Sequence, residues 1–583
     1  MNFLLTGINA KYIHSNPAIY SLAAYTKQFN APDGTPYKEQ VQIAEYTINQ
    51  NIEDILADIY MRKPDVVGFS CYIWNISMVE KLMVNLHRIM PDLPIWLGGP
   101  EVSFHCEKMM EKYPFLTGIM IGEGEATLKE ILDVYATEEP GKAQADAFET
   151  IPGICTRKGY TVDRPCMDLN EIPFFYDNLE NFENRIIYYE SSRGCPFRCK
   201  YCLSSIEKNL RFRNIDTVKR ELQFFLDQKV PQVKFIDRTF NAKKDHSKAI
   251  WTYIKEHDNG VTNFHFEVSA DLLDEEEIAL LKSLRPGLVQ LEIGVQSTNP
   301  ETIQAINRTM DLEKLARNVA SLNETGNVHL HLDLIAGLPH EDYESFGKSF
   351  DDVYAMKPEQ LQLGFLKILK GSMMEEQVPE YGIAYREEPP YEVLFTNDLS
   401  YEDVIKLKQV EAMVELFYNS GQFAHTISFL QKRMGSAFSL YEKLGAFYQK
   451  KGLLTMLSRR LAHYENLLEF AKENDAECED IYVELLTFDA YLRENNKSRP
   501  GFSKDMEPYK NTIRERFQLE EEERKILPHY EGYDYKQMMK MTHVEFFKYT
   551  VWDKEIKETK EQAVLFDYRR RNPVTNSCEI ILW

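Results

Sequence analysis

Three cysteines within eight residues constrain this chain more than any other feature of its sequence. The segment SRGCPFRCKYC contains Cys195, Cys199 and Cys202, a third of the nine cysteines in 583 residues. Gly194 and Pro196 predict that the segment is an irregular loop, because both residue types interrupt helices and strands. Thiols gathered on such a loop are typical of metal binding, so we expect the surrounding fold to be built around a metal centre.

Three interpretations of the triplet compete. Incidental cysteines rarely arise by chance at this spacing on a polar loop. A structural zinc ion prefers four closed ligands, yet no second C-x2-C or H-x3-H pair follows the triplet. A 4Fe-4S cluster held by only three thiolates leaves one iron open to a substrate or cosubstrate. The sequence favours this third interpretation.

The spacing C-x3-C-x2-C, with the aromatic Tyr201 before the last cysteine, resembles the signature of the radical S-adenosylmethionine (SAM) superfamily. The resemblance implies that Cys195, Cys199 and Cys202 bind a 4Fe-4S cluster whose open iron chelates SAM. One electron from the cluster would then cleave SAM to a 5′-deoxyadenosyl radical. Tyr201 matches the aromatic that lies over the adenine in this superfamily. The protein's task would be to hold the cofactors and exclude water.

Strands and helices alternate along the chain after the triplet. Short apolar strands are expected at 232–241, 263–273, 288–297 and 329–339, with helices between them, the longest over 300–326. Such alternation predicts a parallel sheet or barrel. Functional side chains are then expected at the carboxyl ends of the strands.

Polar residues occur at those strand ends and match the superfamily's pattern. The resemblance, closest to the branch that includes coproporphyrinogen dehydrogenase, implies that Glu267 binds the amino group or ribose of SAM. It assigns Gln296 and Arg308 to the sugar and carboxylate, and Asp333 to the ribose hydroxyls. Each residue taken alone also fits a solvated strand end. Asp237 is a further strand-end acid, and its role is open between supporting the cluster and facing the substrate.

The first 137 residues also alternate between strands and helices, which predicts a doubly wound, Rossmann-like α/β domain. Glycine-rich turns at 98–99 and 122–124 fall at strand ends, where backbone must approach a ligand closely. No G-x-G-x-x-G follows the first strand and no P-loop is present, which argues against dinucleotides and nucleoside triphosphates.

Three segments of this domain, VGFSCYIWN, WLGGPEVS and IGEGEATL, resemble the cobalamin-binding domain that precedes many radical SAM enzymes. In that family the loop after the third strand and the glycine-rich turns surround the corrin and its nucleotide tail. The resemblance therefore implies cobalamin contacts from Ser70, Tyr72, Trp74, Gly98, Gly99, Glu101, Gly122, Glu123 and Gly124.

The D-x-H-x-x-G box that supplies a histidine to cobalt is absent. Lys11 stands where the histidine would fall, and His14 lies three residues later. His14 is either a cobalt ligand or a residue that is solvated or contacts the nucleotide tail. Tyr72 and Trp74 either pack against the lower cobalt face or belong to the core.

The remaining chain has a different character. A less periodic stretch precedes the triplet, and beyond about residue 391 the apolar spacing predicts helices. Strands are expected at 550–555 and 563–583, and the basic YRRR of 568–571 is either solvated or an anion clamp. We expect a cobalamin-binding domain over 1–137, a linker over 138–184, a radical SAM partial (βα) barrel over 185–385, and a mainly helical accessory domain of unassigned role over 386–583.

Composition limits the partners. The net charge of −23 disfavours loose binding to nucleic acid, although a local basic groove would still allow it. No apolar run is long enough to cross a bilayer and no signal peptide is recognisable, so we expect a cytoplasmic protein without membrane association. The expected partners are an electron donor, such as flavodoxin or ferredoxin, and a small-molecule or peptide substrate.

The two cofactors together predict methyl transfer from methylcobalamin to an unactivated carbon that the adenosyl radical has activated. Relatives with the same two domains also perform oxidation, cyclisation or rearrangement without methyl transfer, so these reactions are the main alternative. A cobalamin- or redox-sensing protein without catalysis is a third hypothesis, against which the strand-end SAM residues argue.

Overall fold

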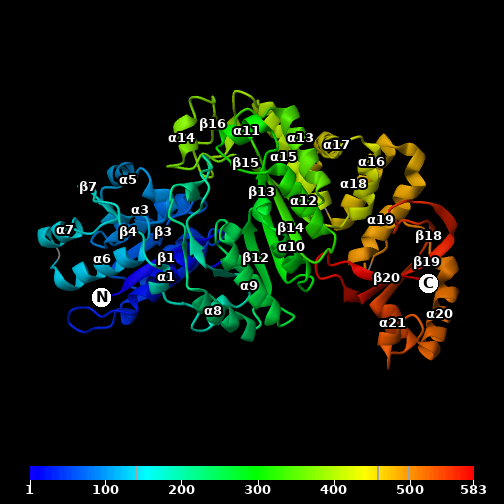
Figure 1. The fold of residues 1–583 in the computed structure, drawn as a ribbon, viewed down its shortest axis with the longest axis horizontal. Helices are drawn as coiled ribbons and strands as arrows, with labels where there is room; N and C mark the ends of the chain where they lie inside the picture. Colours follow the sequence, from blue (N-terminus) through cyan, green and yellow to red (C-terminus); the bar gives the residue numbers. More distant parts are fainter. Residues whose placement is uncertain (140, 456–458, 497) are drawn as a thin grey trace. The chain divides into compact units, whose positions relative to one another are not determined.

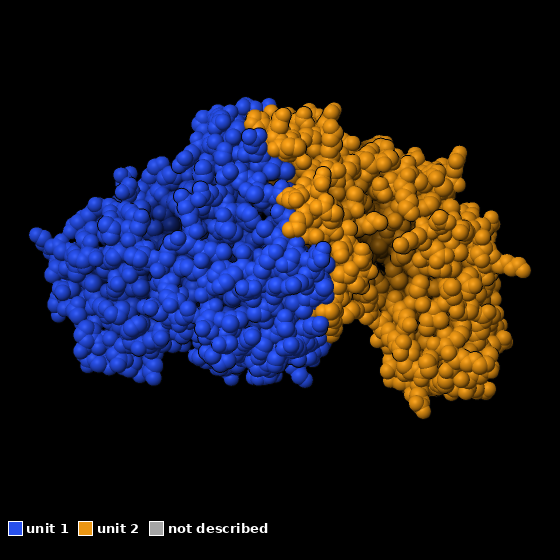
Figure 2. Space-filling view, viewed as in Figure 1, with its two compact units in different colours: residues 1–280, 303–310, 365–397 blue, residues 281–302, 311–364, 398–583 orange. Residues whose placement is uncertain are grey.

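The computed structural model describes residues 1–139, 141–455, 459–496 and 498–583 (Figure 1). These residues divide into two compact units, coloured separately in Figure 2. Unit 1 comprises residues 1–280, 303–310 and 365–397, and unit 2 comprises residues 281–302, 311–364 and 398–583. In the described part of the chain, no helix has the length and apolar character needed to span a membrane.

Unit 1 begins with a seven-stranded sheet in the order β2-β1-β3-β4-β5-β6-β7. The first five strands are parallel: β1 (Phe3–Asn9), β2 (Val41–Thr47), β3 (Val66–Ser70), β4 (Ile95–Gly98) and β5 (Gly118–Met120). Every residue of β1, β3 and β4 is buried. Continuous burial is typical of strands covered on both faces by helices.

Two hydrophobic clusters show which helices cover each face. One contains residues of α2 (Ile52–Met61), α3 (Ile76–Ile89) and α5 (Cys106–Lys112). The other contains residues of α1 (Pro17–Thr26) and α6 (Glu125–Thr137). The predicted doubly wound fold is therefore confirmed. Because β1 lies between β2 and β3, the chain reverses direction across the sheet at β1 and β3, where folds of this class bind ligands.

Part of the predicted linker extends this sheet. The hairpin β6 (Ile154–Thr156) and β7 (Gly159–Tyr160) pairs antiparallel with β5, and α7 (Lys142–Phe148) precedes it. Cys155 in β6 is fully buried in the same core cluster as α5. The segment 142–160 is therefore structurally continuous with the N-terminal domain.

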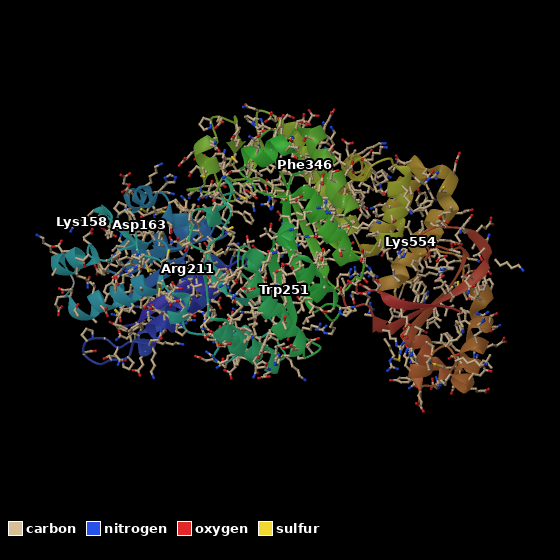
Figure 3. All side chains as sticks on the ribbon, viewed as in Figure 1. Lys158, Asp163, Arg211, Trp251, Phe346 and Lys554 are labelled. Atoms are coloured by element: carbon tan, nitrogen blue, oxygen red, sulfur yellow. The ribbon has the colours of Figure 1, made fainter. Side chains whose placement is uncertain are left out.

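The second half of unit 1 contains the cysteine loop. Parallel strands β8 (Ile187–Tyr189) and β12 (Asn263–Val268) flank β11 (Gln232–Phe235), with α8 (Ile215–Asp227) and α9 (Lys244–Glu256) between them in sequence. A short ladder of β9 (Ser192–Arg193) and β10 (Arg211–Phe212) brackets the cysteines. Trp251 of α9 packs edge-on against Phe266 of β12 in the core (Figure 3).

Unit 2 contains the parallel pair β13 (Val289–Gln296) and β14 (His329–Ala336), with β15 (Gln360–Phe365) beside β14. The expected single helix over 300–326 is wrong. The chain forms α11 (Pro300–Ala305) and α12 (Leu312–Asn323), because Asn307 adopts a φ of +53° and Asp311 caps the second helix at the Lys314 N–H. Helix α13 (Tyr343–Ala355) follows β14.

The rest of unit 2 is mainly helical, as predicted. Its longer helices are α15 (Tyr401–Val414), α16 (Ala424–Arg433), α17 (Ala437–Lys450), α18 (Arg460–Asn474), α19 (Glu479–Arg493), α20 (Lys510–Glu523) and α21 (Tyr535–Met541). Phe438 of α17 packs directly on Gly347 of α13, where a Cβ would lie 2.8 Å from its ring. Helix α17 therefore rests on α13.

A three-stranded antiparallel sheet closes the chain: β18 (Thr542–Tyr549), β19 (Glu558–Arg571) and β20 (Cys578–Leu582). The expected strand at 550–555 is wrong, since this segment forms the turn between β18 and β19. Backbone and side chain of Thr550 hold that turn by hydrogen bonds to Lys557. The strand expected over 563–583 is split into β19 and β20, and YRRR lies in β19.

Candidate functional site

The three cysteines lie on a loop whose two ends are paired. Arg193 in β9 is directly opposite Arg211 in β10, so residues 194–210 form the loop and the two strands its stem. Gly194 adopts a φ of +93°, and a Cβ there would lie 2.5 Å from the Asn209 carbonyl oxygen. Only glycine fits this close approach, which explains the glycine before the first cysteine.

All three cysteines are free thiols. Cys199 is buried, whereas Cys195 and Cys202 are partly exposed. Burial raises the pKa of the Cys199 thiol, and the positive charge of Arg308 opposes that rise. Among the described residues, no three Cys, His, Asp or Glu side chains are close enough to hold one metal ion. The thiolates of a 4Fe-4S cluster each bind a different iron. Three free thiols on one loop are the donor set of a cluster with three protein ligands.

Arg308 contacts the cysteine loop directly. Its guanidinium Nη1 lies 3.6 Å from the Cys199 sulfur and donates to the Tyr201 hydroxyl at 3.2 Å. The backbone beside it supports the loop as well, because the Lys200 N–H donates to the Ile306 carbonyl at 3.0 Å. The structure thus brings Arg308 and Tyr201 together at the cysteines, while their contacts with SAM stay a prediction.

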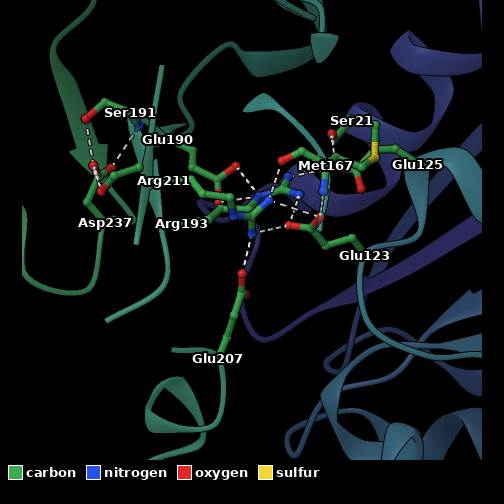
Figure 4. Close-up of polar contacts among 11 residues, drawn as sticks. Ser21, Glu123, Glu125, Met167, Glu190, Ser191, Arg193, Glu207, Arg211 and Asp237 are labelled. Atoms are coloured by element: carbon green, nitrogen blue, oxygen red, sulfur yellow. Dashed lines mark hydrogen bonds and ion pairs between the residues drawn. The ribbon is translucent and has the colours of Figure 1, made fainter. Parts of the chain in front are cut away.

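Asp237 supports the stem of the loop, which answers the question that the sequence left open. Its carboxylate is 1% exposed and accepts three hydrogen bonds, at 2.9 Å from the Ser191 N–H and at 2.6 Å from each hydroxyl of Ser191 and Ser192 (Figure 4). His246 Nε2 lies 3.0 Å from the Ser191 hydroxyl. Burial raises the pKa of Asp237 to about 6 and lowers that of His246 to about 4.

Glu267 lies on β12, where Arg238 Nη1 is 3.8 Å from its carboxylate. Gln296 and Asp333 lie on the neighbouring strands β13 and β14 of unit 2. Gln296 ends β13 at a bulge with a φ of +75°, and no described residue donates a hydrogen bond to its buried Oε1. A buried acceptor of this kind fits a polar cosubstrate. The contacts of Glu267, Gln296 and Asp333 with SAM stay predictions.

His331 is a residue that sequence reasoning missed. Its Nε2 lies 3.0 Å from Asp333 Oδ1. Both residues point to the same face of β14, since they are two positions apart. The H-x-D spacing of His331 and Asp333 was the feature of the sequence that could have identified His331.

An aromatic pair follows β3 in the N-terminal domain. The rings of Tyr72 and Trp74 stack with centroids 4.3 Å apart and planes 6° apart, and Trp74 is 45% exposed. The Trp74 indole N–H donates to the Ile8 carbonyl of β1 at 3.1 Å. Asn75, another residue that sequence reasoning missed, donates to the same carbonyl at 3.0 Å and to Ser70 O at 2.9 Å. The pair is therefore fixed where the ends of β1 and β3 meet.

The loop after β1 contains buried polar groups without partners. No described residue forms a hydrogen bond with the Ser15 hydroxyl or with Asn16 Oδ1, although both residues are buried. Buried polar groups of this kind are normally satisfied by a ligand or water. His14 Nδ1 lies 2.6 Å from the Tyr188 hydroxyl, and burial lowers its pKa. The residues present therefore fit a bound polar ligand such as cobalamin.

Only one of the four glycines in the two turns remains open for a ligand. A Cβ on Gly99 would lie 2.5 Å from the Cys71 carbonyl, and one on Gly124 would lie 2.9 Å from Leu22. Gly98 has ordinary packing room beside Met120. At Gly122, whose φ is +76°, no atom lies within 4 Å of the Cβ position. At Gly99 and Gly124 the sequence predicted that the backbone approaches a ligand, but there it lies close to Cys71 and Leu22 of the chain itself.

Two acids beside these glycines, Glu101 in the short helix α4 (Pro100–Ser103) and Glu123 in the turn after β5, are engaged by other parts of unit 1. Glu101 is buried and accepts hydrogen bonds from Lys370 and Tyr391. Beside this contact, Gly371 lies against Phe104 so closely that a Cβ would overlap its ring. Glu123 accepts from Arg193 and Arg211. Their predicted contacts with cobalamin stay predictions.

Three family models match the chain in succession. Residues 4–132 match "B12 binding domain", residues 189–353 match "Radical SAM superfamily", and residues 379–566 match "Protein of unknown function (DUF4080)". The first two segments contain the stacked aromatic pair and the cysteine loop respectively. Together they imply a 4Fe-4S cluster, SAM and cobalamin as cofactors.

Curated relatives match the chain at low identity. The 2-(S-pantetheinyl)-carbapenam-3-carboxylate methyltransferase of Streptantibioticus cattleyicolor is 22% identical over 69% of this chain and 64% of its own length. The anaerobic magnesium-protoporphyrin IX monomethyl ester cyclase of Cereibacter sphaeroides is 21% identical over 54% of this chain and 53% of its own length. The chain thus spans about half to two thirds of the length of these relatives.

Among solved structures, the cobalamin-dependent S-adenosylmethionine radical enzyme OxsB matches with a TM-score of 0.58 and 14% identity. The match covers 83% of this chain and 80% of OxsB. At this identity the match shows a shared fold. The chain thus combines a B12-binding domain and a domain of the radical SAM superfamily with a C-terminal DUF4080 domain of unknown function.

Proposed function

We propose that this protein is a cobalamin-dependent radical SAM methyltransferase that methylates an unactivated carbon. Two findings support the proposal. The chain joins a B12-binding domain to a radical SAM domain, and a relative that matches 69% of this chain is named a methyltransferase. A hydrogen-abstracting radical and a methyl donor are the two components that such a reaction requires.

The cluster and SAM, when bound, supply a hydrogen-abstracting radical, and cobalamin supplies a methyl group. The residues of the chain hold these groups in place. Asp237 fixes the start of the cysteine loop, and Arg308 donates to the loop from the other side. Preorganised groups of this kind reduce the reorganisation needed at the moment of reaction.

The stacked rings of Tyr72 and Trp74 are the main observation in support of cobalamin binding. The stack is half-exposed, rigidly anchored to Ile8, and located where β1 and β3 reverse the strand order. An exposed aromatic face that is already ordered matches the flat, apolar face of a corrin. The Ser15 hydroxyl and Asn16 Oδ1, which no described residue hydrogen-bonds, lie on the adjoining loop and offer polar contacts.

We further propose that the protein works in the reducing cytoplasm with an electron donor such as flavodoxin or ferredoxin. The net charge of −23 favours a small-molecule or peptide substrate over nucleic acid. The unexplained DUF4080 domain is one candidate for substrate selection.

The test uses anaerobic, reconstituted protein with cobalamin, SAM and a reductant. Methyl transfer predicts 5′-deoxyadenosine together with S-adenosylhomocysteine, because regeneration of methylcobalamin consumes a second SAM. SAM with a deuterated methyl group, incubated with a metabolite extract, should also label the product and so identify the substrate. The Cys195→Ala, Cys199→Ala, Cys202→Ala variant is the control and should yield no 5′-deoxyadenosine.

One alternative has a specific observation in its favour. A relative with similar coverage is named a cyclase, so radical chemistry without methyl transfer occurs among the relatives. Formation of 5′-deoxyadenosine without S-adenosylhomocysteine would favour that alternative and contradict the proposal. Formation of neither product would favour a cobalamin- or redox-sensing protein.

A further inference from the structure

We propose that two arginines and two glutamates form a clamp that positions the cysteine loop against the B12-binding domain. The clamp consists of Arg193 and Arg211 from the stem of the loop, of Glu123 from the turn after β5, and of Glu125 at the start of α6. This inference rests on the proposed function, because it concerns how two cofactor-binding elements are held relative to each other.

Arg193 connects three carboxylates. Its Nη1 donates to Glu123 at 3.1 Å and its Nη2 donates to Glu125 at 2.7 Å (Figure 4). Its Nε donates to Glu190 at 2.8 Å. The guanidinium therefore uses all three of its nitrogens on acids, two of which belong to the B12-binding domain.

Arg211 reaches the same turn from the opposite strand of the stem. It donates to Glu123 Oε1 at 2.6 Å and to Glu123 Oε2 at 3.2 Å. It also donates to the Met167 carbonyl at 2.5 Å and pairs with Glu207 inside the loop. Glu123 Oε2 in turn accepts from the Met167 N–H at 2.7 Å.

The location of the clamp distinguishes it from a general contact between domains. Arg193 and Arg211 are opposite each other in the ladder, so the clamp grips both ends of the loop at once. Arg193 is also two residues from Cys195. On the other side, Glu123 lies between Gly122 and Gly124, in the turn that the family resemblance assigns to cobalamin, and Glu125 begins α6 directly after that turn. A shift of the clamp therefore changes the distance between the two cofactor-binding elements.

The four side chains of the clamp are largely shielded from water. The side chains of Arg193 and Arg211 are 17% and 18% exposed, and those of Glu123 and Glu125 are 14% and 5% exposed. Ion pairs shielded from water lose little to screening. The planar fork of arginine also binds carboxylates at two points, which lysine cannot reproduce. We therefore expect Arg211→Lys to weaken the clamp although the charge is kept.

The variants to test are Arg211→Lys and the isosteric Glu123→Gln. The matched control is Arg164→Lys, since Arg164 makes a two-point ion pair with Glu130 of α6 in the same domain but does not contact the loop. All three are prepared anaerobically as full-length protein with iron, sulfide and cobalamin. Iron content and the thermal midpoint of unfolding identify any variant that fails to fold.

The first measurement is EPR of protein in which the reduced cluster and cob(II)alamin are both paramagnetic. Their magnetic coupling falls steeply with distance. We expect Arg211→Lys and Glu123→Gln to change the splitting and the relaxation of the signals, with Arg164→Lys like the wild type. Coupling in both clamp variants that is identical to the wild type would overturn the clamp.

The second measurement is hydrogen–deuterium exchange of residues 194–210, which requires neither cobalamin nor turnover. We expect exchange in both clamp variants to be about tenfold faster than in Arg164→Lys, as for local opening that has become easier. Unchanged exchange would also overturn the clamp. Failure of the proposed function is separate: wild-type protein without S-adenosylhomocysteine would refute methyl transfer, whereas the exchange data would still decide on the clamp.

Discussion

Asp237 shows what a sequence reveals about a single residue and what it conceals. An acid at the end of an apolar strand was recognisable, and its place near the cysteine loop was expected. Its partners, Ser191 and Ser192, are about 45 residues away in sequence and become neighbours only because β8 pairs with β11. Contacts that depend on the register of a parallel sheet cannot be derived from one segment alone.

We predict that Asp237→Asn destabilises the protein at neutral pH by about 2–4 kcal/mol, because an amide cannot accept three hydrogen bonds without placing a donor against another donor. Iron retention after reconstitution should fall as well. Urea denaturation and iron analysis measure both effects. Asp227→Asn, at the exposed end of α8, is the control and should change neither.

The same carboxyl predicts a pH dependence. Its folded pKa, about 6, lies above the ordinary value of 3.8, so folding favours the protonated form. The part of the stability that comes from this raised pKa is therefore complete below about pH 4 and is lost as the pH rises through about 6, whereas the hydrogen bonds of Asp237 contribute at both ends of this range. The stability difference between wild type and Asp237→Asn should shrink by roughly 1–3 kcal/mol across this range. A constant difference would show that Asp237 titrates normally.

Trp74 carries a prediction about binding. We expect Trp74→Ala to weaken cobalamin binding about tenfold, because the loss of a stacked aromatic contact costs roughly 1 kcal/mol or more. Trp74→Phe should restore part of the affinity. Equilibrium dialysis with absorbance detection measures this, and Tyr60→Ala, an exposed aromatic on α2, is the control. Equal affinity in Trp74→Ala would remove the stack from the cobalamin site.

At the scale of elements, periodicity predicted most strands and helices correctly and failed where local geometry decides. The strands around 232–235, 263–268, 289–296 and 329–336 are present, since continuous or alternating apolar runs determine them. The helix expected over 300–326 is broken because Asn307 takes a left-handed conformation, which periodicity does not register. The loop that contains the cysteines was recognised from its composition, whereas its stem of two residue pairs was too short to predict.

Gly194 tests the account of the loop. We predict that Gly194→Ala costs more than about 2 kcal/mol, since the added Cβ meets the Asn209 carbonyl as well as straining the backbone. Gly260→Ala is the matched control, because its φ of +75° is also positive but no atom lies near its Cβ position. Thermal unfolding and iron content compare the two. A similar cost in both variants would show that backbone strain alone matters at Gly194.

At the scale of the whole molecule, the order of the domains was predictable and their internal boundaries were not. The B12-binding, radical SAM and C-terminal segments each contain their own signal, and all three are matched by family models. The segment 138–184 was expected to be a linker because it is less periodic, yet β6 and β7 within it extend the N-terminal sheet. Short antiparallel strands at the edge of a sheet need little apolar sequence and are therefore easily missed.

Glu101 and Glu123 also show that contacts between distant segments cannot be predicted from the sequence. Family resemblance placed Glu101 and Glu123 in turns that face a ligand, and both turns are where it predicted. Their carboxylates are engaged by Lys370, Tyr391, Arg193 and Arg211, which come from distant segments of the chain. Such pairings arise only when separately folded segments meet.

The central claim is that the three cysteines leave one iron free to bind SAM. EPR of the reduced, anaerobic protein tests this claim directly, with and without SAM. We predict a 4Fe-4S signal whose shape changes when SAM is added, because the cosubstrate coordinates the open iron. A sample that contains iron but whose signal is unaffected by SAM, or a reconstituted protein without an iron–sulfur signal, would contradict the account.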